Sequence, residues 1–313
     1  MIELLIASCE LPIAVMLLQT FHSFTQHAMG PAALVTLHAS ILLFLIAAII
    51  SVIALLQPRK VRMAWADWTG AAGAFCLGAY FIARFTEAGS EPFTNLFEVI
   101  ELAGLCLVLA YFIATRMRKL PALGAFAFPA VAIIFIVNLA FADSAAQGHE
   151  STPLLVIHVL LTLLSYGAFF MASLAAVMFL VLERALKKHQ DPTLIRSFPP
   201  LESLKRLVDT CILVGLPLLS LGLVLGFIAL SPSGWESIVR NPKIPPSLVL
   251  WAVLLLVAAG RWLGFLRGRR NFYMVLLGFA LVVMTFVGLG VWSRSNSRVQ
   301  TAAVVGKVSC IGT

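Results

Sequence analysis

Residues 153–182 read PLLVIHVLLTLLSYGAFFMASLAAVMFLVL, thirty positions that contain no Asp, Glu, Lys or Arg. The hydrocarbon core of a bilayer is roughly 30 Å thick, so a helix of about 20 consecutive apolar residues can cross it. This stretch is longer than that requirement. It therefore predicts a transmembrane helix, and similar stretches along the chain decide the fold.

The composition extends this prediction to the whole chain. Hydrophobic residues make up 61% of the 313 residues and charged residues 12%, whereas ordinary soluble domains contain about 25% charged residues. A soluble core cannot bury so much apolar surface. We predict an all-α fold, a polytopic integral membrane helical bundle with eight strong transmembrane helices. They run near residues 32–56, 66–86, 95–115, 122–142, 153–182, 208–230, 246–266 and 272–292.

The first twenty residues, MIELLIASCELPIAVMLLQT, are apolar but include Glu3, Glu10 and Pro12. They fit a ninth span, an interfacial helix or a poor signal-like segment. No basic region precedes the apolar run and no A-x-A site follows it, which disfavours a cleaved signal peptide. We predict three regions: an N-terminal apolar segment over 1–30, a transmembrane domain over 31–293 and a C-terminal tail over 294–313.

Lysine and arginine collect in every second predicted loop, which indicates the orientation of the chain. The loops after the first, third, fifth and seventh spans carry Arg59, Lys60, Arg62, Arg116, Arg118, Lys119, Arg184, Lys187, Lys188, Arg196, Lys205, Arg206, Arg267, Arg269 and Arg270. Loops 87–94 and 143–152 have none, and loop 231–245 has only Arg240 and Lys243. The positive-inside rule puts the basic loops in the cytoplasm. The opposite loops and the C-terminus are then on the outer face of a bacterial inner membrane.

The net charge of +8 is mostly this orientation signal and calls for no nucleic-acid partner. The five cysteines, Cys9, Cys76, Cys106, Cys211 and Cys310, form no CxxC pair. That spacing argues against a thiol-redox motif and against a c-type haem attachment site in this chain. Cys310 is predicted on the oxidising outer side, where it is either free or paired between chains.

Two histidines are predicted to lie inside the bilayer near its outer surface. If the fifth span starts near Pro153, His158 lies roughly 8 Å below that surface at about 1.5 Å per residue. His38, in PAALVTLHASILLF, enters from the same side at a similar depth. Imidazole is a metal ligand as well as a hydrogen-bonding core residue. The two histidines thus either hold a haem iron or another metal between them, or each bonds a neighbouring carbonyl or hydroxyl group.

Two carboxylates stand where the third span begins, in EPFTNLFEVIEL at residues 91–102. Glu98 and Glu101 are one helical turn apart and face the same side. Thr94 or Asn95 can cap the helix, and Glu98 then completes an arrangement close to a capping box and lies at the positive end of the helix dipole. Glu101 is a turn deeper, and capping does not explain it.

These segments resemble a known family. EPFTNLFE is similar to the P-x-S-N-x-Y-E segment of the CcsA/ResC/HemX cytochrome c assembly family, with Thr94 for Ser and Phe97 for Tyr. The helix LLVIHVLLTLLSYGAFF resembles that family's outer-face histidine helix, and FPPLESLKRLVDTC resembles the segment that follows it. WAVLLLVAAGRWLGFLRGRRNFYMVLLG is similar to the final helix pair of the divergent HemX/YpjD-like branch. The resemblance covers about residues 32–292 in the same order and orientation.

The resemblance implies haem handling on the outer face and delivery of haem to apocytochrome c. His158 matches an outer-face haem-ligand histidine of the family. The family's tryptophan-rich loop corresponds to SGWESIVRNPKIPP, which keeps Trp235 and has Arg240, Asn241, Pro242 and Lys243 in place of W-D-P-K. Family histidines are absent from residues 68–86, from the region around Ala259 and from GLGVWSRSNSR.

We therefore predict a membrane haem-handling factor that is not an enzyme, since no nucleophile or acid–base dyad is visible. His158, with His38 as a second ligand, would bind haem beneath a lid of Trp235 and Phe93. Arg240 and Lys243 would pair with the propionates, and Asn95, Glu98 and Glu101 would form one wall. The predicted partners are haem, apocytochrome c or another membrane assembly subunit, and the lipid bilayer.

Two other functions stay open. One is a ligand-free membrane scaffold or regulator, either of haem metabolism or of another membrane complex. The other is a transporter with a path lined by Glu98, Glu101, Asn138 and Asp209. Most of these carboxylates lie at helix ends, whereas transporters bind substrate near the midplane of the bilayer.

Overall fold

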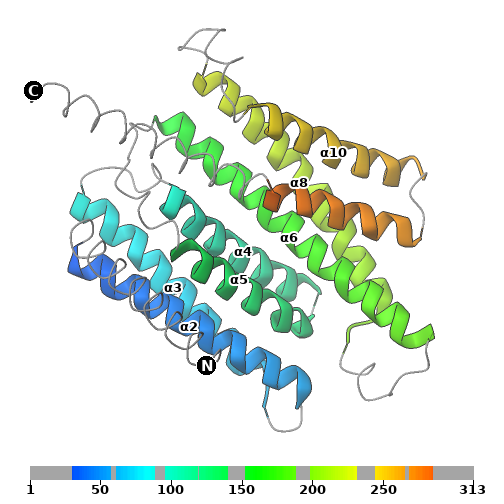
Figure 1. Cartoon of the computed structure of the whole chain (residues 1–313), viewed down its shortest axis with the longest axis horizontal. Coiled ribbons are helices and arrows are strands. Elements are labelled where there is room, and N and C mark those ends of the chain that lie inside the picture. Colours follow the sequence, from blue (N-terminus) through cyan, green and yellow to red (C-terminus); the bar gives the residue numbers. More distant parts are fainter. Residues whose placement is uncertain are drawn as a thin grey trace, which may run out of the picture. The chain divides into compact units, whose positions relative to one another are not determined.

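The computed structural model describes residues 30–57, 61–88, 96–118, 120–139, 152–187, 198–230, 244–264 and 268–284. Within these ranges the regular structure is helical and no strand occurs, which confirms the all-α prediction for this part of the chain. Figure 1 shows α2 (Pro31–Leu56), α3 (Met63–Ala88), α4 (Leu96–Arg118), α5 (Gly124–Leu139), α6 (Pro153–Lys187), α8 (Leu201–Leu230) and α10 (Ile244–Trp262). A short 3-10 helix, η1 (Pro121–Leu123), directly precedes α5. A further helix covers residues 269–284.

Four of the described helices are long and apolar enough to cross a membrane: Pro31–Leu56, Phe97–Met117, Pro153–Lys187 and Leu201–Ala229. The helices Gly124–Asn138 and Ser247–Trp262 are apolar but shorter. At about 1.5 Å per residue the 16 residues of α5 reach about 24 Å, less than the roughly 30 Å of hydrocarbon. The structure thus agrees with a helical membrane bundle, while eight strong spans are not confirmed.

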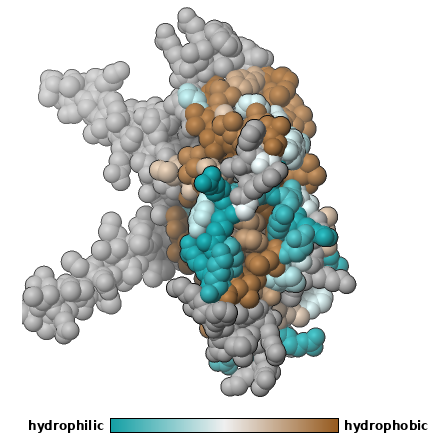
Figure 2. All heavy atoms as spheres, turned by 90° about the vertical axis from the view of Figure 1, so that its right-hand side faces the viewer, coloured by the Kyte–Doolittle hydropathy of each residue, from teal (hydrophilic) through white to brown (hydrophobic). Residues whose placement is uncertain are grey.

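Helix α3 coincides with the predicted span 66–86 but is not one of those four, and Asp67, Arg84 and several glycines lie within it. Large apolar side chains nevertheless form an exposed stripe along it, three or seven residues apart: Trp65, Trp68, Phe75, Ile82 and Phe85. Such a stripe suits contact with lipid tails. Figure 2 shows one face of the molecule, where hydrophobic residues cover much of the described surface and hydrophilic residues gather in patches.

The helices fall into two compact units, and the first contains α2, α3, α5 and the part of α4 up to Leu109. Helix α2 packs against both α3 and α5. Phe44 of α2 meets Phe135 of α5 with ring centroids 5.2 Å apart. A Cβ at Gly70 would collide with the Phe128 ring, and one at Gly104 with the Phe135 ring. Because Gly70 and Gly104 have no side chain, α3 and α4 leave room for Phe128 and Phe135 of α5.

The second unit begins at Ala110 and contains the end of α4, α6, α8, α10 and residues 269–284. Helices α6 and α8 run side by side, and α10 packs on α8. Ser165 of α6 donates a hydrogen bond of 2.8 Å to the Gly215 carbonyl of α8. Trp251 of α10 donates one of 2.9 Å to the Ser220 hydroxyl.

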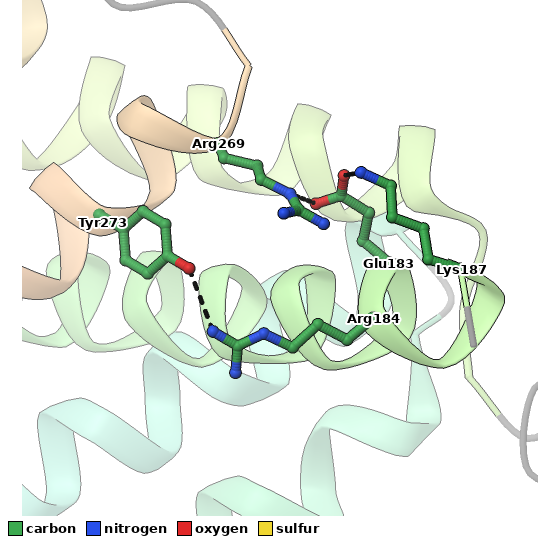
Figure 3. A network of polar contacts seen from close by, with 5 residues as sticks. All are labelled: Glu183, Arg184, Lys187, Arg269 and Tyr273. Atoms are coloured by element: carbon green, nitrogen blue, oxygen red, sulfur yellow. Dashed lines mark hydrogen bonds and ion pairs between the residues drawn. The ribbon is translucent and has the colours of Figure 1, made fainter. Parts of the chain in front are cut away.

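Polar contacts join the end of α6 to the helix 269–284 (Figure 3). Glu183 accepts a hydrogen bond from Arg269 at 2.7 Å and pairs with Lys187 at 3.1 Å. Arg184 donates to the Tyr273 hydroxyl at 3.1 Å. The basic stretches predicted to be cytoplasmic, after the fifth and seventh spans, thus meet around one carboxylate. Exposed ion pairs of this kind contribute little to stability, so their main effect is on which helices lie next to each other.

Candidate functional site

His158 lies five residues after Pro153 at the start of α6 and is partly buried. Its Nδ1 is 2.6 Å from the carbonyl oxygen of Gly222 on α8. A carbonyl oxygen can only accept a hydrogen bond, so Nδ1 carries the hydrogen and donates it. In the neutral ring, Nε2 is then the nitrogen with a free lone pair, and that lone pair is what a metal ligand needs.

Two glycines on α8 make the groove in which this imidazole lies. Gly222 and Gly226 are four residues apart and so share one face of the helix. A Cβ at Gly226 would be 2.7 Å from Cε1 and 2.8 Å from Nδ1 of His158. A Cβ at Gly222 would be 2.7 Å from Cγ2 of Thr162. A side chain at Gly226 would therefore push the ring away from the carbonyl that fixes its tautomer.

His38 has different surroundings. It is exposed on α2, and its Nδ1 lies 2.7 Å from the Leu34 carbonyl oxygen of its own helix. His38 belongs to the first unit and His158 to the second. Their pairing as two ligands of one metal stays a prediction.

Glu98 lies in the first turn of α4, as expected, and is fully buried. Its Oε1 accepts hydrogen bonds from Arg84 of α3, with distances of 2.9 Å to Nε and 2.8 Å to Nη2. Sequence reasoning missed Arg84 because it treated residues 66–86 only as an apolar span. The available signal was an arginine near the end of one span and a glutamate at the start of the next, on the same side. Thr94 and Asn95, the predicted caps, lie outside the described residues.

Glu101, which capping did not explain, is fully buried and bonded to α5. The Nδ2 group of Asn138 donates to Glu101 Oε1 at 2.9 Å and to the Phe97 carbonyl oxygen at 3.0 Å. Glu98, Glu101 and Asn138 thus come together in the first unit. Asp209 of the suggested transport path is in the second unit, where it pairs with Arg261 of α10.

The remaining predicted site residues, Phe93, Asn95, Trp235, Arg240 and Lys243, lie outside the described ranges. In the part of the chain that is described, no group of three or more His, Cys, Asp or Glu residues is arranged to hold a metal ion.

Comparison with known proteins confirms the resemblance to the cytochrome c assembly family that the sequence segments indicated. Residues 93–295 match the family described as Cytochrome C assembly protein. Protein HemX of Brevibacillus brevis is 28% identical over 195 residues, which cover 59% of this chain and 67% of that protein. The cytochrome c biogenesis protein CcsA of Guillardia theta is 26% identical over 229 residues, 66% and 75% of the two chains. Inner membrane protein YpjD of Escherichia coli K12 is 26% identical over 188 residues, 59% and 68%. The chain belongs to the cytochrome c assembly protein family.

Proposed function

We propose that this protein binds haem at the outer face of the bacterial inner membrane and presents it for c-type cytochrome biogenesis. Family membership supports the role in cytochrome c biogenesis. The four long apolar helices support a multi-pass membrane protein. The inner membrane, the outer position of the site and the outer C-terminus come from the distribution of Lys and Arg.

The observation that carries the proposal is the hydrogen bond from His158 Nδ1 to the Gly222 carbonyl. Histidines that bind metals usually donate their other ring hydrogen to a carbonyl or carboxylate, which fixes the tautomer and orients the ring. His158 meets this condition, with Nε2 as the atom for a haem iron. Haem is the cargo of the protein in this proposal, and one axial histidine is a common way for proteins to hold it.

The other predicted contacts complete the proposed site. Arg240 and Lys243 would pair with the propionates, Trp235 would cover the porphyrin, and His38 would be the second iron ligand. Glu98 and Glu101 are fully buried, which favours a role in positioning the start of α4 over direct contact with haem.

A ligand-free scaffold is the second candidate. The same His158 hydrogen bond joins α6 to α8, and a scaffold would need this contact between the two helices even if it bound no haem. On this reading the histidine stabilises helix packing and binds nothing.

Haem titration of the purified protein separates the two functions. We expect a Soret band in the wild type that His158→Ala abolishes and Glu202→Gln, on the exposed surface of α8, leaves unchanged. A His38→Ala variant should bind more weakly, since it removes the second ligand, and binding equal to wild type would remove the pairing proposal. A folded wild-type protein without any haem-dependent band would favour the scaffold.

A further inference from the structure

The first unit contains a buried polar cluster to which the proposed haem function gives no chemical role. It consists of Tyr80 and Arg84 from α3, Glu98 and Glu101 from α4 and Asn138 from α5. Tyr80, Glu98, Glu101 and Asn138 are all fully buried. Charged and polar groups at such depth are expensive, and in membrane proteins they mark functional sites by default.

Counted over the described residues, the charges of this cluster do not balance when every group takes its usual form. Arg84 and Glu98 form an ion pair of 2.8 Å, in which one positive and one negative charge cancel. Glu101 then adds a second negative charge, and the hydrogen bond that its carboxyl group accepts comes from a neutral amide. A buried carboxylate without a compensating charge is strongly unfavourable, and such a group usually takes up a proton instead.

The hydrogen-bonding atoms also indicate that Glu101 carries a proton. Asn138 Nδ2 has two hydrogens, and they go to Glu101 Oε1 and to the Phe97 carbonyl. The remaining oxygens of the two partners, Glu101 Oε2 and Asn138 Oδ1, are buried and have no hydrogen-bond partner among the residues that the structure describes. Both can only accept while Glu101 is ionised. A proton on Oε2 turns it into a donor, and Asn138, whose Nδ2 lies 2.9 Å from the other oxygen of the same carboxyl group, offers its amide oxygen as an acceptor.

We propose that Glu101 is a buried proton-binding site whose carboxylic acid pairs with the Asn138 side chain and so joins α4 to α5. One proton removes the unbalanced charge and gives both orphaned oxygens a role. The inference does not depend on haem binding.

Few other titratable or charged groups lie on the helices around Glu101. Helix α3 contributes Tyr80 and Arg84, and α4 contributes Glu98. Helix α5 has no titratable side chain, and the one on α2, His38, is exposed. Loss of the proton from Glu101 would leave a bare negative charge in this cluster and weaken the contact between α4 and α5. Proton uptake and release are thereby linked to the packing of the first unit.

Infrared spectroscopy of the full-length protein in detergent tests the proposal directly. A protonated carboxyl group has a C=O stretching band that an ionised carboxylate lacks. We expect the wild type to show this band at neutral pH, Glu101→Gln to lose it, and Glu202→Gln, which removes an exposed carboxylate, to keep it. Asn138→Leu should shift the band, because the acid loses its hydrogen-bond partner. A wild type without the band at neutral pH, or a band that survives in Glu101→Gln, would overturn the proposal.

Thermal unfolding provides an independent measurement. The unfolded chain exposes Glu101 to water, where its carboxyl group is ionised at neutral pH, whereas the folded protein keeps the proton. Folded molecules then bind more protons than unfolded ones at neutral pH, so stability falls as pH rises. The unfolding midpoint of the wild type should fall more steeply with pH than that of Glu101→Gln. A midpoint that instead rises with added NaCl or KCl, and only when Glu101 is present, would show a cation site and contradict the proton.

Discussion

At the scale of single residues, three polar contacts between helices stand out in this largely apolar chain. They join Arg84 to Glu98, Asn138 to Glu101 and His158 to the Gly222 carbonyl. Each is buried or partly buried, and each joins two different helices. In an apolar environment such contacts specify which helices pair, because a polar group that misses its partner is costly.

Replacement of Arg84 by Met should destabilise the protein strongly. The substitution leaves Glu98, which is 1% exposed in the ion pair, buried without its counter-charge, and loss of one partner of a buried pair costs about 3 to 5 kcal/mol. The double variant Arg84→Met with Glu98→Gln should recover most of this loss, since it buries no charge. Unfolding midpoints of the two variants in detergent check this, and equal midpoints would contradict the ion-pair account.

At the scale of helices, the glycines of α8 explain why α6 can approach closely enough for His158 to reach a backbone carbonyl. A Cβ added at Gly215 would meet Ala168 and Phe169, one at Gly222 would meet Thr162, and one at Gly226 would meet His158. Small residues at helix contacts are the usual way in which membrane helices approach one another. The groove is therefore a property of α8, and the histidine occupies it.

Substitution of Gly226 by Ala should displace the His158 ring, because the new Cβ would lie 2.7 Å from Cε1. We expect weaker haem binding and a lower unfolding midpoint. Gly78→Ala on α3 is the matched control, since its Cβ would meet nothing within 4 Å. That control should even gain up to about 1 kcal/mol from the better helix propensity of Ala. Haem affinity unchanged in Gly226→Ala would argue against a His158 ring held in this groove.

At the scale of the whole chain, the sequence determined the helical class and the position of the helices well. Every predicted span overlaps a described helix, because apolar length is a local property. The contacts were not predictable in the same way. Glu98 lies 14 residues from Arg84, Glu101 lies 37 from Asn138, and His158 lies 64 from Gly222. These partners depend on which helices are neighbours, and periodicity alone does not say that.

The predicted orientation is a property of the whole chain and can be measured. Single cysteines placed in loops 87–94 and 143–152 of a cysteine-free variant should react with a membrane-impermeant thiol reagent added to intact cells. Cysteines at 59–62 should react only after the cells are opened, because that loop is predicted to be cytoplasmic. The opposite labelling pattern would place His158 near the cytoplasmic surface and rule out an outer-face site.

Haem titration across a set of His158 variants tests the central claim most directly. His158→Gln keeps a donor for the Gly222 carbonyl but lacks the imidazole, so it separates packing from iron ligation. The account predicts that His158→Gln folds like the wild type yet loses the Soret band of bound haem. It also predicts that added imidazole restores the band in His158→Ala. Wild-type haem affinity in His158→Gln, or no effect of imidazole on His158→Ala, would contradict the assignment of His158 as the haem ligand.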